Sequence, residues 1–161
     1  MVQKTSFNRS WMTNKMFRGS APTKIDDKGR LKVPTEFRRI LEEQYGPEVF
    51  ITSVTGESAN LYPLPVWEEI EGRLARVPSS DRAKLRFLER VNYFGQQLKL
   101  DGQGRVVVPQ ILRDRAEMVG EVVVSGRIEF LEIWNRERFD QRLGEEPFTE
   151  EDYKALAGLG V

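Results

Sequence analysis

A long internal repeat constrains this 161-residue chain more than any other feature of its sequence. When the sequence is shifted by 75 residues, the segment 23–38 (TKIDDKGRLKVPTEFR) aligns with 98–113 (LKLDGQGRVVVPQILR), and seven of sixteen positions are identical. Chance gives about one identity over such a length, so the match indicates a duplication. A weaker match follows, because 46–53 and 120–125 both place a glycine before a strand-like run. The chain is therefore expected to contain two copies of one unit.

Each copy has the pattern of a β-rich unit: strand, turn, strand, short helix, strand, turn, strand, and the start of a helix. In the first copy the turn is 26–29, where Gly29 supplies a positive φ and Asp26 accepts hydrogen bonds from loop amides. Pro34 ends the second strand and suits the start of a helix, predicted from Thr35 to Gln44 and terminated by Gly46. The pattern predicts an α+β fold that is rich in strands.

Helical patterns fill the region between the copies and the end of the chain. Trp67, Ile70, Leu74 and Val77 recur at three- and four-residue spacing and predict a helix before Pro78, and Ser79 or Ser80 can cap the next one. One side of that second helix carries a row of arginines at four-residue spacing, which is more typical of a solvated face than of a binding surface: Arg82, Arg86 and Arg90. The segment 149–158 reads as a short, capped, peripheral helix.

The composition removes most classes of catalytic chemistry. The chain has no Cys and no His, which excludes disulfides, thiol nucleophiles, imidazole acid–base catalysis and nearly all nitrogen- or sulfur-ligated metal sites. No apolar run approaches the roughly 20 residues of a membrane-spanning helix. Residues 1–15 also lack the apolar stretch of a signal peptide. We therefore expect a cytoplasmic protein that has no cofactor, no metal, no membrane partner and no small-molecule substrate.

Charge is unevenly distributed, although the net charge is zero. Residues 1–35 contain eight basic and two acidic residues, whereas the remainder contains 17 basic and 23 acidic residues. Such an asymmetry is typical of a face or arm that binds a polyanion. For residues 1–15 taken alone, a flexible and solvated extension is the better interpretation.

The element Asp-x-x-Gly-Arg occurs at the tip of a predicted hairpin in both copies, at Asp26–Arg30 and Asp101–Arg105. It has two possible uses. The carboxylate can fix the turn by accepting N–H groups and pairing with Arg, or the tip can reach phosphates or a guanine edge. The copies differ, because Lys28 and Lys32 correspond to Gln103 and Val107 in the second copy. This difference favours a first tip that faces a polyanion and a second that serves mainly the fold or the assembly.

Enzymatic interpretations are weaker. Asp26 and Asp27 point apart in extended chain, and no third carboxylate lies at loop-ligand spacing. Ser58 lies in a stretch that superficially looks like a nucleophile elbow, but it falls between two strands and the chain has no His partner, so we predict a turn residue. The stretch 102–104 lacks the third glycine and the following helix of a dinucleotide fingerprint. The chain is predicted not to be an enzyme.

Four stretches together resemble the MraZ family: 16–19 (MFRG), 25–34 (IDDKGRLKVP), 61–64 (LYPL) with Trp67, and 100–105 (LDGQGR). The similarity runs from Met16 to about Leu143. It implies two tandem, fused swapped-hairpin domains of the AbrB/SpoVT type, closed into barrel-like repeats with peripheral helices. The corresponding division is an extension at 1–15, a first repeat at 16–65, a helical linker at 66–93, a second repeat at 94–143 and a tail at 144–161.

The resemblance also implies a function. MraZ-like proteins are expected to be bacterial transcription regulators of the division and cell wall gene cluster, associated with the nucleoid. They are expected to bind tandem promoter repeats in double-stranded DNA as a ring-shaped homo-oligomer, such as an octamer. The DNA-facing candidates are Arg18, Lys24, Lys28, Gly29, Arg30, Lys32 and Arg105, and the turn-structuring residues are Asp26, Asp101 and Gly104. The alternative is an assembly protein whose ring has no DNA role.

Overall fold

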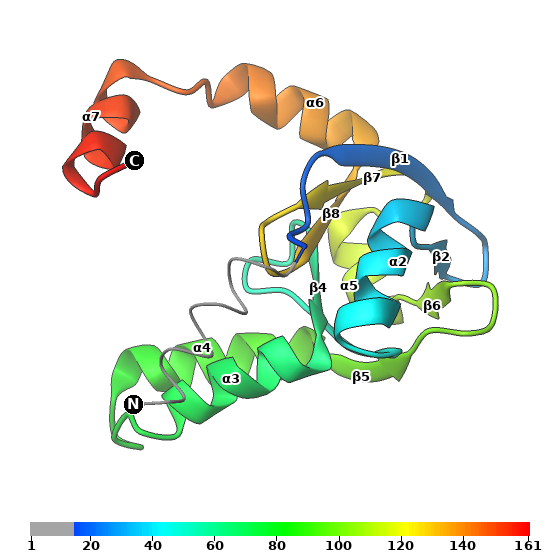
Figure 1. Cartoon of the computed structure of the whole chain (residues 1–161), viewed down its shortest axis with the longest axis horizontal. Coiled ribbons are helices and arrows are strands. Elements are labelled where there is room, and N and C mark those ends of the chain that lie inside the picture. The colour runs from blue at the N-terminus through cyan, green and yellow to red at the C-terminus, as the bar shows by residue number, and fades with distance from the viewer. Residues whose placement is uncertain (1–14) are drawn as a thin grey trace.

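The computed structural model describes residues 15–161, so the predicted extension lies outside the described part except for its last residue. The first copy comprises β1 (Ser20–Ile25), β2 (Arg30–Lys32), α2 (Thr35–Gln44), β3 (Glu48–Thr52), β4 (Ala59–Pro63) and α3 (Leu64–Leu74). The second comprises β5 (Gln96–Lys99), β6 (Arg105–Val107), α5 (Gln110–Ala116), β7 (Gly120–Gly126), β8 (Leu131–Asn135) and α6 (Arg136–Glu145). Helix α4 (Arg82–Phe94) connects the copies, and α7 (Glu150–Gly158) follows them (Figure 1). The predicted order of elements is confirmed in both copies.

Strands of the two copies are interleaved in one eight-stranded sheet of order β5-β3-β4-β8-β7-β1-β2-β6. Strand β1 of the first copy pairs with β7 of the second, from Ser20 opposite Ser125 to Ile25 opposite Gly120. In the equivalent way, β5 of the second copy pairs with β3 of the first. The end strands β5 and β6 are joined by one short turn, so the sheet curls into a nearly closed barrel. The predicted α+β, β-rich fold with swapped repeats is confirmed, because each copy completes the sheet of the other.

One hydrophobic core receives side chains from both copies. Leu31 and Val106 face each other on β2 and β6, and both are buried. Helix α2 adds Phe37 and Leu41, and α5 adds Leu112, all of them buried. Successive side chains of a strand point to opposite faces. The outward positions of β2 and β6 are therefore the ones on either side of these core residues, and they remain available to a partner.

Prolines and glycines set the ends of the short helices. Pro34, Pro63 and Pro109 occupy the N-cap positions of α2, α3 and α5, where a residue without an N–H leaves no donor unsatisfied. Gly46 has a φ of +94° and donates its N–H to the carbonyl of Leu41 at 2.9 Å. The predicted helix from Thr35 to Gln44 and its terminating glycine are confirmed.

Helices α3 and α4 lie on the opposite side of the barrel from the β1–β2 and β5–β6 turns (Figure 1). Asp81 caps α4 by accepting the N–H of Lys84 at 2.9 Å, so the prediction of Ser79 or Ser80 as the cap was wrong. The serines belong to a turn closed by the N–H of Asp81 on the carbonyl of Pro78, which delays the helix by one residue. The predicted arginine row on α4 is exposed: Arg82, Arg86 and Arg90.

The C-terminal helices lie at the periphery. Asn135 caps α6 by accepting the N–H of Arg138, and Thr149 and Asp152 form a capping box at α7. Neither helix has a buried residue, and α7 stands away from the barrel in Figure 1. The predicted capped, peripheral helix ending at Gly158 is confirmed. Over residues 15–161, no helix combines the length and the apolar character that crossing a membrane requires.

Candidate nucleic-acid interface

The first turn is fixed by the carboxylate of Asp26. Its Oδ1 accepts the backbone N–H groups of Lys28 (3.0 Å) and Arg30 (2.9 Å), and its Oδ2 accepts Nε of Arg30 at 2.7 Å. Gly29 has a φ of +82° and donates its N–H to the carbonyl of Asp26 at 3.0 Å. Asp26 therefore accepts four hydrogen bonds within the loop, and the side chain of Arg30 is held in a defined direction.

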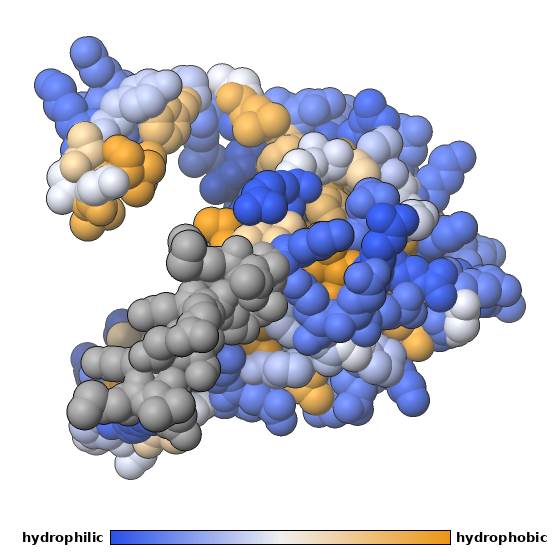
Figure 2. Space-filling view, in the orientation of Figure 1, coloured by the Kyte–Doolittle hydropathy of each residue, from blue (hydrophilic) through white to orange (hydrophobic). Residues whose placement is uncertain are grey.

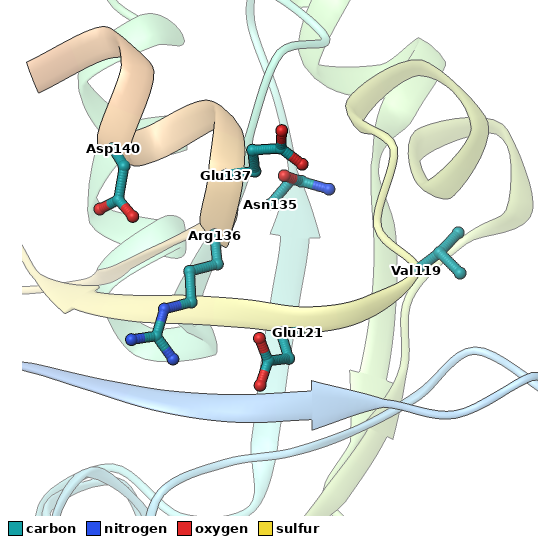
Figure 3. A pocket seen from close by; sticks show the side chains of 6 residues that line it. All are labelled: Val119, Glu121, Asn135, Arg136, Glu137 and Asp140. Carbon is teal, nitrogen blue, oxygen red and sulfur yellow. The ribbon is translucent and has the colours of Figure 1, made fainter. Parts of the chain in front are cut away.

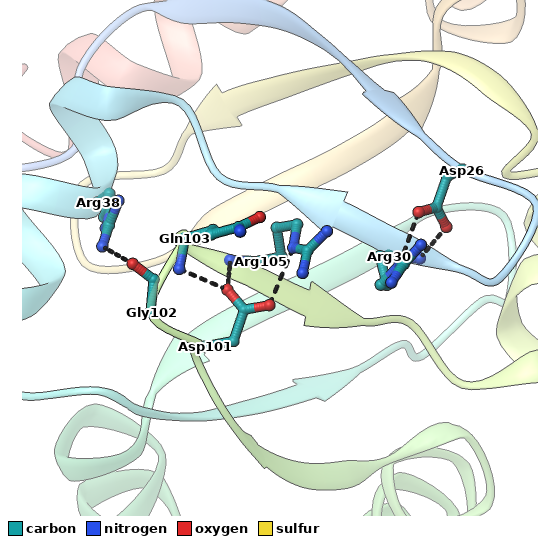
Figure 4. A network of polar contacts seen from close by, with 7 residues as sticks. All are labelled: Asp26, Arg30, Arg38, Asp101, Gly102, Gln103 and Arg105. Carbon is teal, nitrogen blue, oxygen red and sulfur yellow. Dashed lines mark hydrogen bonds and ion pairs between the residues drawn. The ribbon is translucent and has the colours of Figure 1, made fainter.

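The second turn repeats this geometry (Figure 4). Asp101 accepts the N–H groups of Gln103 (2.9 Å) and Arg105 (2.8 Å) on Oδ1, and Nε of Arg105 at 2.9 Å on Oδ2. Gly104 has a φ of +74°. The sequence-based interpretation of the aspartates as turn-fixing residues agrees with these contacts in both copies. The Asp, Gly and Arg residues that are identical in the two copies are thus explained by the geometry of the turn. Any difference in function between the two turns depends on the side chains that are not identical.

These hydrogen bonds lower the pKa of both aspartates. For Asp26 the largest cause is the N–H of Arg30, and for Asp101 it is the N–H of Arg105. The guanidinium of the same arginine adds to the effect, while partial desolvation opposes it. Both carboxylates are therefore ionised at neutral pH, and each turn keeps its ion pair.

Each turn glycine lies against an arginine of the other copy. A Cβ on Gly29 would fall 2.5 Å from Cζ of Arg113, and one on Gly104 would fall 2.6 Å from Cδ of Arg38. The carbonyl of Gly29 also accepts the N–H of Val108 at 2.9 Å. Sequence reasoning did not assign Arg38 and Arg113 to the site, although they are the last identical pair in the repeat alignment. That identity is explained by the reciprocal contact.

Strands β2 and β6 pair antiparallel and form a two-stranded ribbon between the two turns. Arg30 lies opposite Val107, and Lys32 lies opposite Arg105. Because the intervening Leu31 and Val106 are buried, these four residues share the outward face. We call Arg30, Lys32, Arg105 and Val107 the ribbon face. The face places three cations beside one another and one exposed valine, 46% accessible, beside Arg30.

Both arginines of the ribbon face retain donors. Within residues 15–161, Nε is the only side-chain nitrogen of Arg30 and of Arg105 that donates a hydrogen bond to the protein, which leaves their terminal nitrogens free. The side chains are partly covered, at 36% and 30% accessibility. An arginine that is oriented by a carboxylate and still has free terminal donors is suited to bidentate contact with phosphate or guanine.

The structure groups most of the predicted site residues but not all of them. Lys28 is exposed at the apex of the first turn, and Lys24 is exposed on β1 opposite Glu121. Gly29 is buried, so its part in the site is to shape the turn. Arg18 is exposed two residues before the start of β1, about 20 Å along the extended chain from Lys24. Arg18 therefore lies outside the group around the ribbon face.

The turns project together from one side of the molecule, where the space-filling view is predominantly hydrophilic (Figures 1 and 2). A hollow of about 380 Å³ has a different lining, with three carboxylates and a single cation (Figure 3): Val119, Glu121, Asn135, Arg136, Glu137 and Asp140. Its excess of acids disfavours a polyanion. The ribbon face and its turns are therefore the better candidate interface.

Comparison with known proteins assigns the chain to a family. The family described as "MraZ protein, putative antitoxin-like" matches residues 16–90 and 95–157. The chain belongs to the MraZ family. A protein named Transcriptional regulator MraZ from Acidobacterium capsulatum is 51% identical over 146 residues, covering 91% of this chain and 100% of that protein. Namesakes from Koribacter versatilis (46% over 147 residues; 91% and 100%) and Neisseria meningitidis serogroup A (37% over 129 residues; 80% and 85%) are also similar.

The resemblance inferred from the four sequence stretches, which include both turn signatures, is thus confirmed. The two matched segments of the MraZ family contain the two structural repeats, and both Asp-x-x-Gly-Arg turns lie within them. MraZ membership, together with the names of these relatives, supports a role in transcription regulation.

Proposed function

We propose that this MraZ protein is a sequence-specific, DNA-binding transcription regulator of the bacterial division and cell wall gene cluster, and that it acts at the nucleoid. The observation that carries the proposal is the ribbon face, where Arg30, Lys32 and Arg105 lie side by side between two ordered turns. A two-stranded ribbon fits the major groove of B-DNA, which is about 12 Å wide.

The proposed contacts divide into base-reading and positioning groups. The terminal nitrogens of Arg30 and Arg105 are free to bond guanine O6 and N7, and their pairing with aspartate fixes the approach. Lys24, Lys28 and Lys32 supply charge to phosphates, which sets the register without reading sequence. We assign Arg18 to more distant phosphates, because β1 separates it from the ribbon face. Gly29, Asp26, Asp101 and Gly104 hold the turns.

Self-assembly into a ring, such as an octamer, extends the same proposal. One ribbon face presents three cations, so a single contact is weak at physiological salt. Several ribbon faces on one DNA act together through effective concentration, provided that the promoter repeats match their spacing. Tandem repeats in the promoter are therefore the expected target.

The first test measures binding of Arg30→Ala to DNA from immediately upstream of the protein's own gene. We expect a loss of about 1–3 kcal/mol in binding free energy together with relaxed sequence preference. Arg73→Ala is the matched control, because Arg73 is an exposed arginine of α3, a helix that lies on the opposite side of the barrel from the two turns. A mobility-shift titration in which Arg30→Ala retains promoter DNA as wild type does would refute the assignment.

A salt series separates this proposal from a ring without a DNA role. Affinity of a phosphate-contacting protein falls steeply with salt concentration, whereas a pure assembly protein binds neither promoter nor random DNA at any salt. Binding to both DNAs with the same affinity would support contact with phosphates and contradict sequence-specific recognition.

A further inference from the structure

Helix α7 is built to be helical by its own local contacts. Thr149 and Asp152 exchange hydrogen bonds in a capping box, with the N–H of Asp152 on Thr149 Oγ1 at 3.2 Å and the N–H of Thr149 on Asp152 Oδ2 at 2.9 Å. Phe148, just before the cap, packs edge-to-face on Tyr153 with ring centroids 4.7 Å apart. Capping box and hydrophobic staple together fix the beginning of the helix.

The rest of α7 is exposed. Tyr153, Leu156 and Leu159 follow one another at three-residue spacing and are 67%, 37% and 80% accessible. Orange surface gathers on this part of the molecule in Figure 2, on the helix that stands apart from the barrel in Figure 1. An isolated helix of nine residues is marginal in water, even with good caps. A covering surface would therefore stabilise it.

A second exposed surface lies on α4. At 100° per residue, six residues of α4 share the side opposite the buried Val91, and we call them the α4 outer face: Arg82, Leu85, Arg86, Glu89, Arg90 and Tyr93. Its apolar members, Leu85 and Tyr93, are 45% and 55% accessible. A hollow of about 290 Å³ adjoins it, where the guanidinium carbon of Arg115 lies 6.0 Å from the Tyr93 ring centroid.

The two surfaces are complementary in charge as well as in apolar character. Residues 146–161 contain four acidic side chains and one basic side chain. The α4 outer face contains three arginines and one glutamate, and Arg115 adds a further cation beside it. Opposite charges around apolar centres favour association and fix its register. The sequence alone favours a solvated role for the arginine row of α4. The charge of the tail gives the same arginines a role in association.

We propose that α7 of one copy docks on the α4 outer face of a second copy of this chain. The donor and the receptor are different surfaces of the same molecule, so the contact is heterologous, and it closes into a ring when the rotation between neighbours allows. The inference rests on the proposed self-assembly and names the surfaces that build it. Tyr153, Leu156 and Leu159 fill the space around Tyr93, while Glu150, which lies about 60° around the helix from Tyr153, faces the arginines.

Cross-linking tests the docking directly, because the chain contains no cysteine. Leu156→Cys and Tyr93→Cys are placed in separate chains, co-expressed and treated with a short bismaleimide. We expect a covalent heterodimer, since each chain carries only one thiol. The control replaces Tyr93→Cys by Val107→Cys, an exposed apolar position on the ribbon face. No heterodimer above this control, or an internal cross-link alone when both cysteines are in one chain, overturns the inference.

Charge reversal provides an independent measurement. Arg86→Glu with Arg90→Glu should raise the dissociation constant of the assembly on the order of tenfold in sedimentation velocity. Glu150→Lys should act in the same direction, and combining it with the two arginine changes should restore part of the lost assembly. Arg73→Glu is the control for a charge change at an exposed position of the other helix beside the barrel, α3. Assembly that is unchanged in all variants, or a wild-type protein that stays monomeric, overturns the inference.

DNA binding distinguishes this failure from failure of the proposed function. On a short duplex that carries one promoter repeat, the α4 and α7 variants should bind as wild type does, whereas Arg30→Ala should not. On tandem repeats the same α4 and α7 variants should lose affinity through lost multivalency. If assembly is unaffected but Arg30→Ala still loses single-repeat binding, the docking is wrong and the ribbon proposal stands.

Discussion

Gly29 of the first repeat packs against Arg113 of the second, and Gly104 packs against Arg38 in the reciprocal position. A Cβ on Gly29 would lie 2.5 Å from Cζ of Arg113, whose Nε donates to the carbonyl of Val108 at 3.0 Å. The turn that presents Arg30 is therefore supported from behind by the other copy. A change at this contact is therefore expected to affect both the conformation of the ribbon face and the stability of the interleaved fold.

Gly29→Ala should lower the free energy of unfolding by about 1–2 kcal/mol from the positive φ alone, with an added cost for displacing Arg113. Adding Arg113→Ala should remove the steric part and leave the backbone part. Chemical denaturation of the single and double variants measures both. Gly72→Ala on α3 is the control, because its Cβ meets open space and a helical alanine stabilises by about 0.5–1 kcal/mol. Wild-type stability of Gly29→Ala would contradict this account.

The sequence predicts the repeated elements well because their signals are local. Proline at the start and glycine at the end of α2, and aspartate at the turns, act over fewer than a dozen residues. The pairing of Arg30 with Val107, across 77 positions, follows from the exchange of strands between copies and has no local signal. Without knowledge of this pairing, the sequence analysis treats the first turn as facing DNA and the second as mainly structural. The structure instead places Lys32 of the first copy opposite Arg105 of the second, on one shared face.

Acid should weaken the fold through the turn aspartates. Their folded-state pKa values lie below the ordinary aspartate value, so their stabilising contribution is complete above about pH 3.9 and disappears as pH falls through the lower folded-state value. Asp26→Asn with Asp101→Asn should be less stable than wild type at pH 6, and the difference should shrink towards pH 3. Urea denaturation across this range measures it. Asp27→Asn is the neighbouring control, and a pH-independent difference would count against the mechanism.

Lys24 should behave as a phosphate contact. Lys24→Ala is expected to weaken promoter and random DNA alike and to reduce the slope of log affinity against log salt by about one. Fluorescence anisotropy with both duplexes over a salt series measures the slope. Glu121 lies opposite Lys24 on β7, so Glu121→Gln should strengthen binding to both DNAs. A change in sequence preference for Lys24→Ala would place it among base-reading residues instead.

The difference between Lys32 and Val107 on the ribbon face provides a sharp test of whether both copies contact DNA. Lys32 and Val107 occupy equivalent positions of the duplicated sequence, so Lys32→Val and Val107→Lys can be exchanged without changing the charge of the face. Each single change should shift the salt slope by about one, downwards for Lys32→Val and upwards for Val107→Lys. If both strands enter the groove together, the double variant should recover wild-type affinity for random DNA, because the number of phosphate contacts is restored. Its promoter affinity should remain lower, since the lysine then lies beside Arg30 instead of Arg105. Random-DNA affinity that stays at the Lys32→Val level would show that only the first strand contacts DNA.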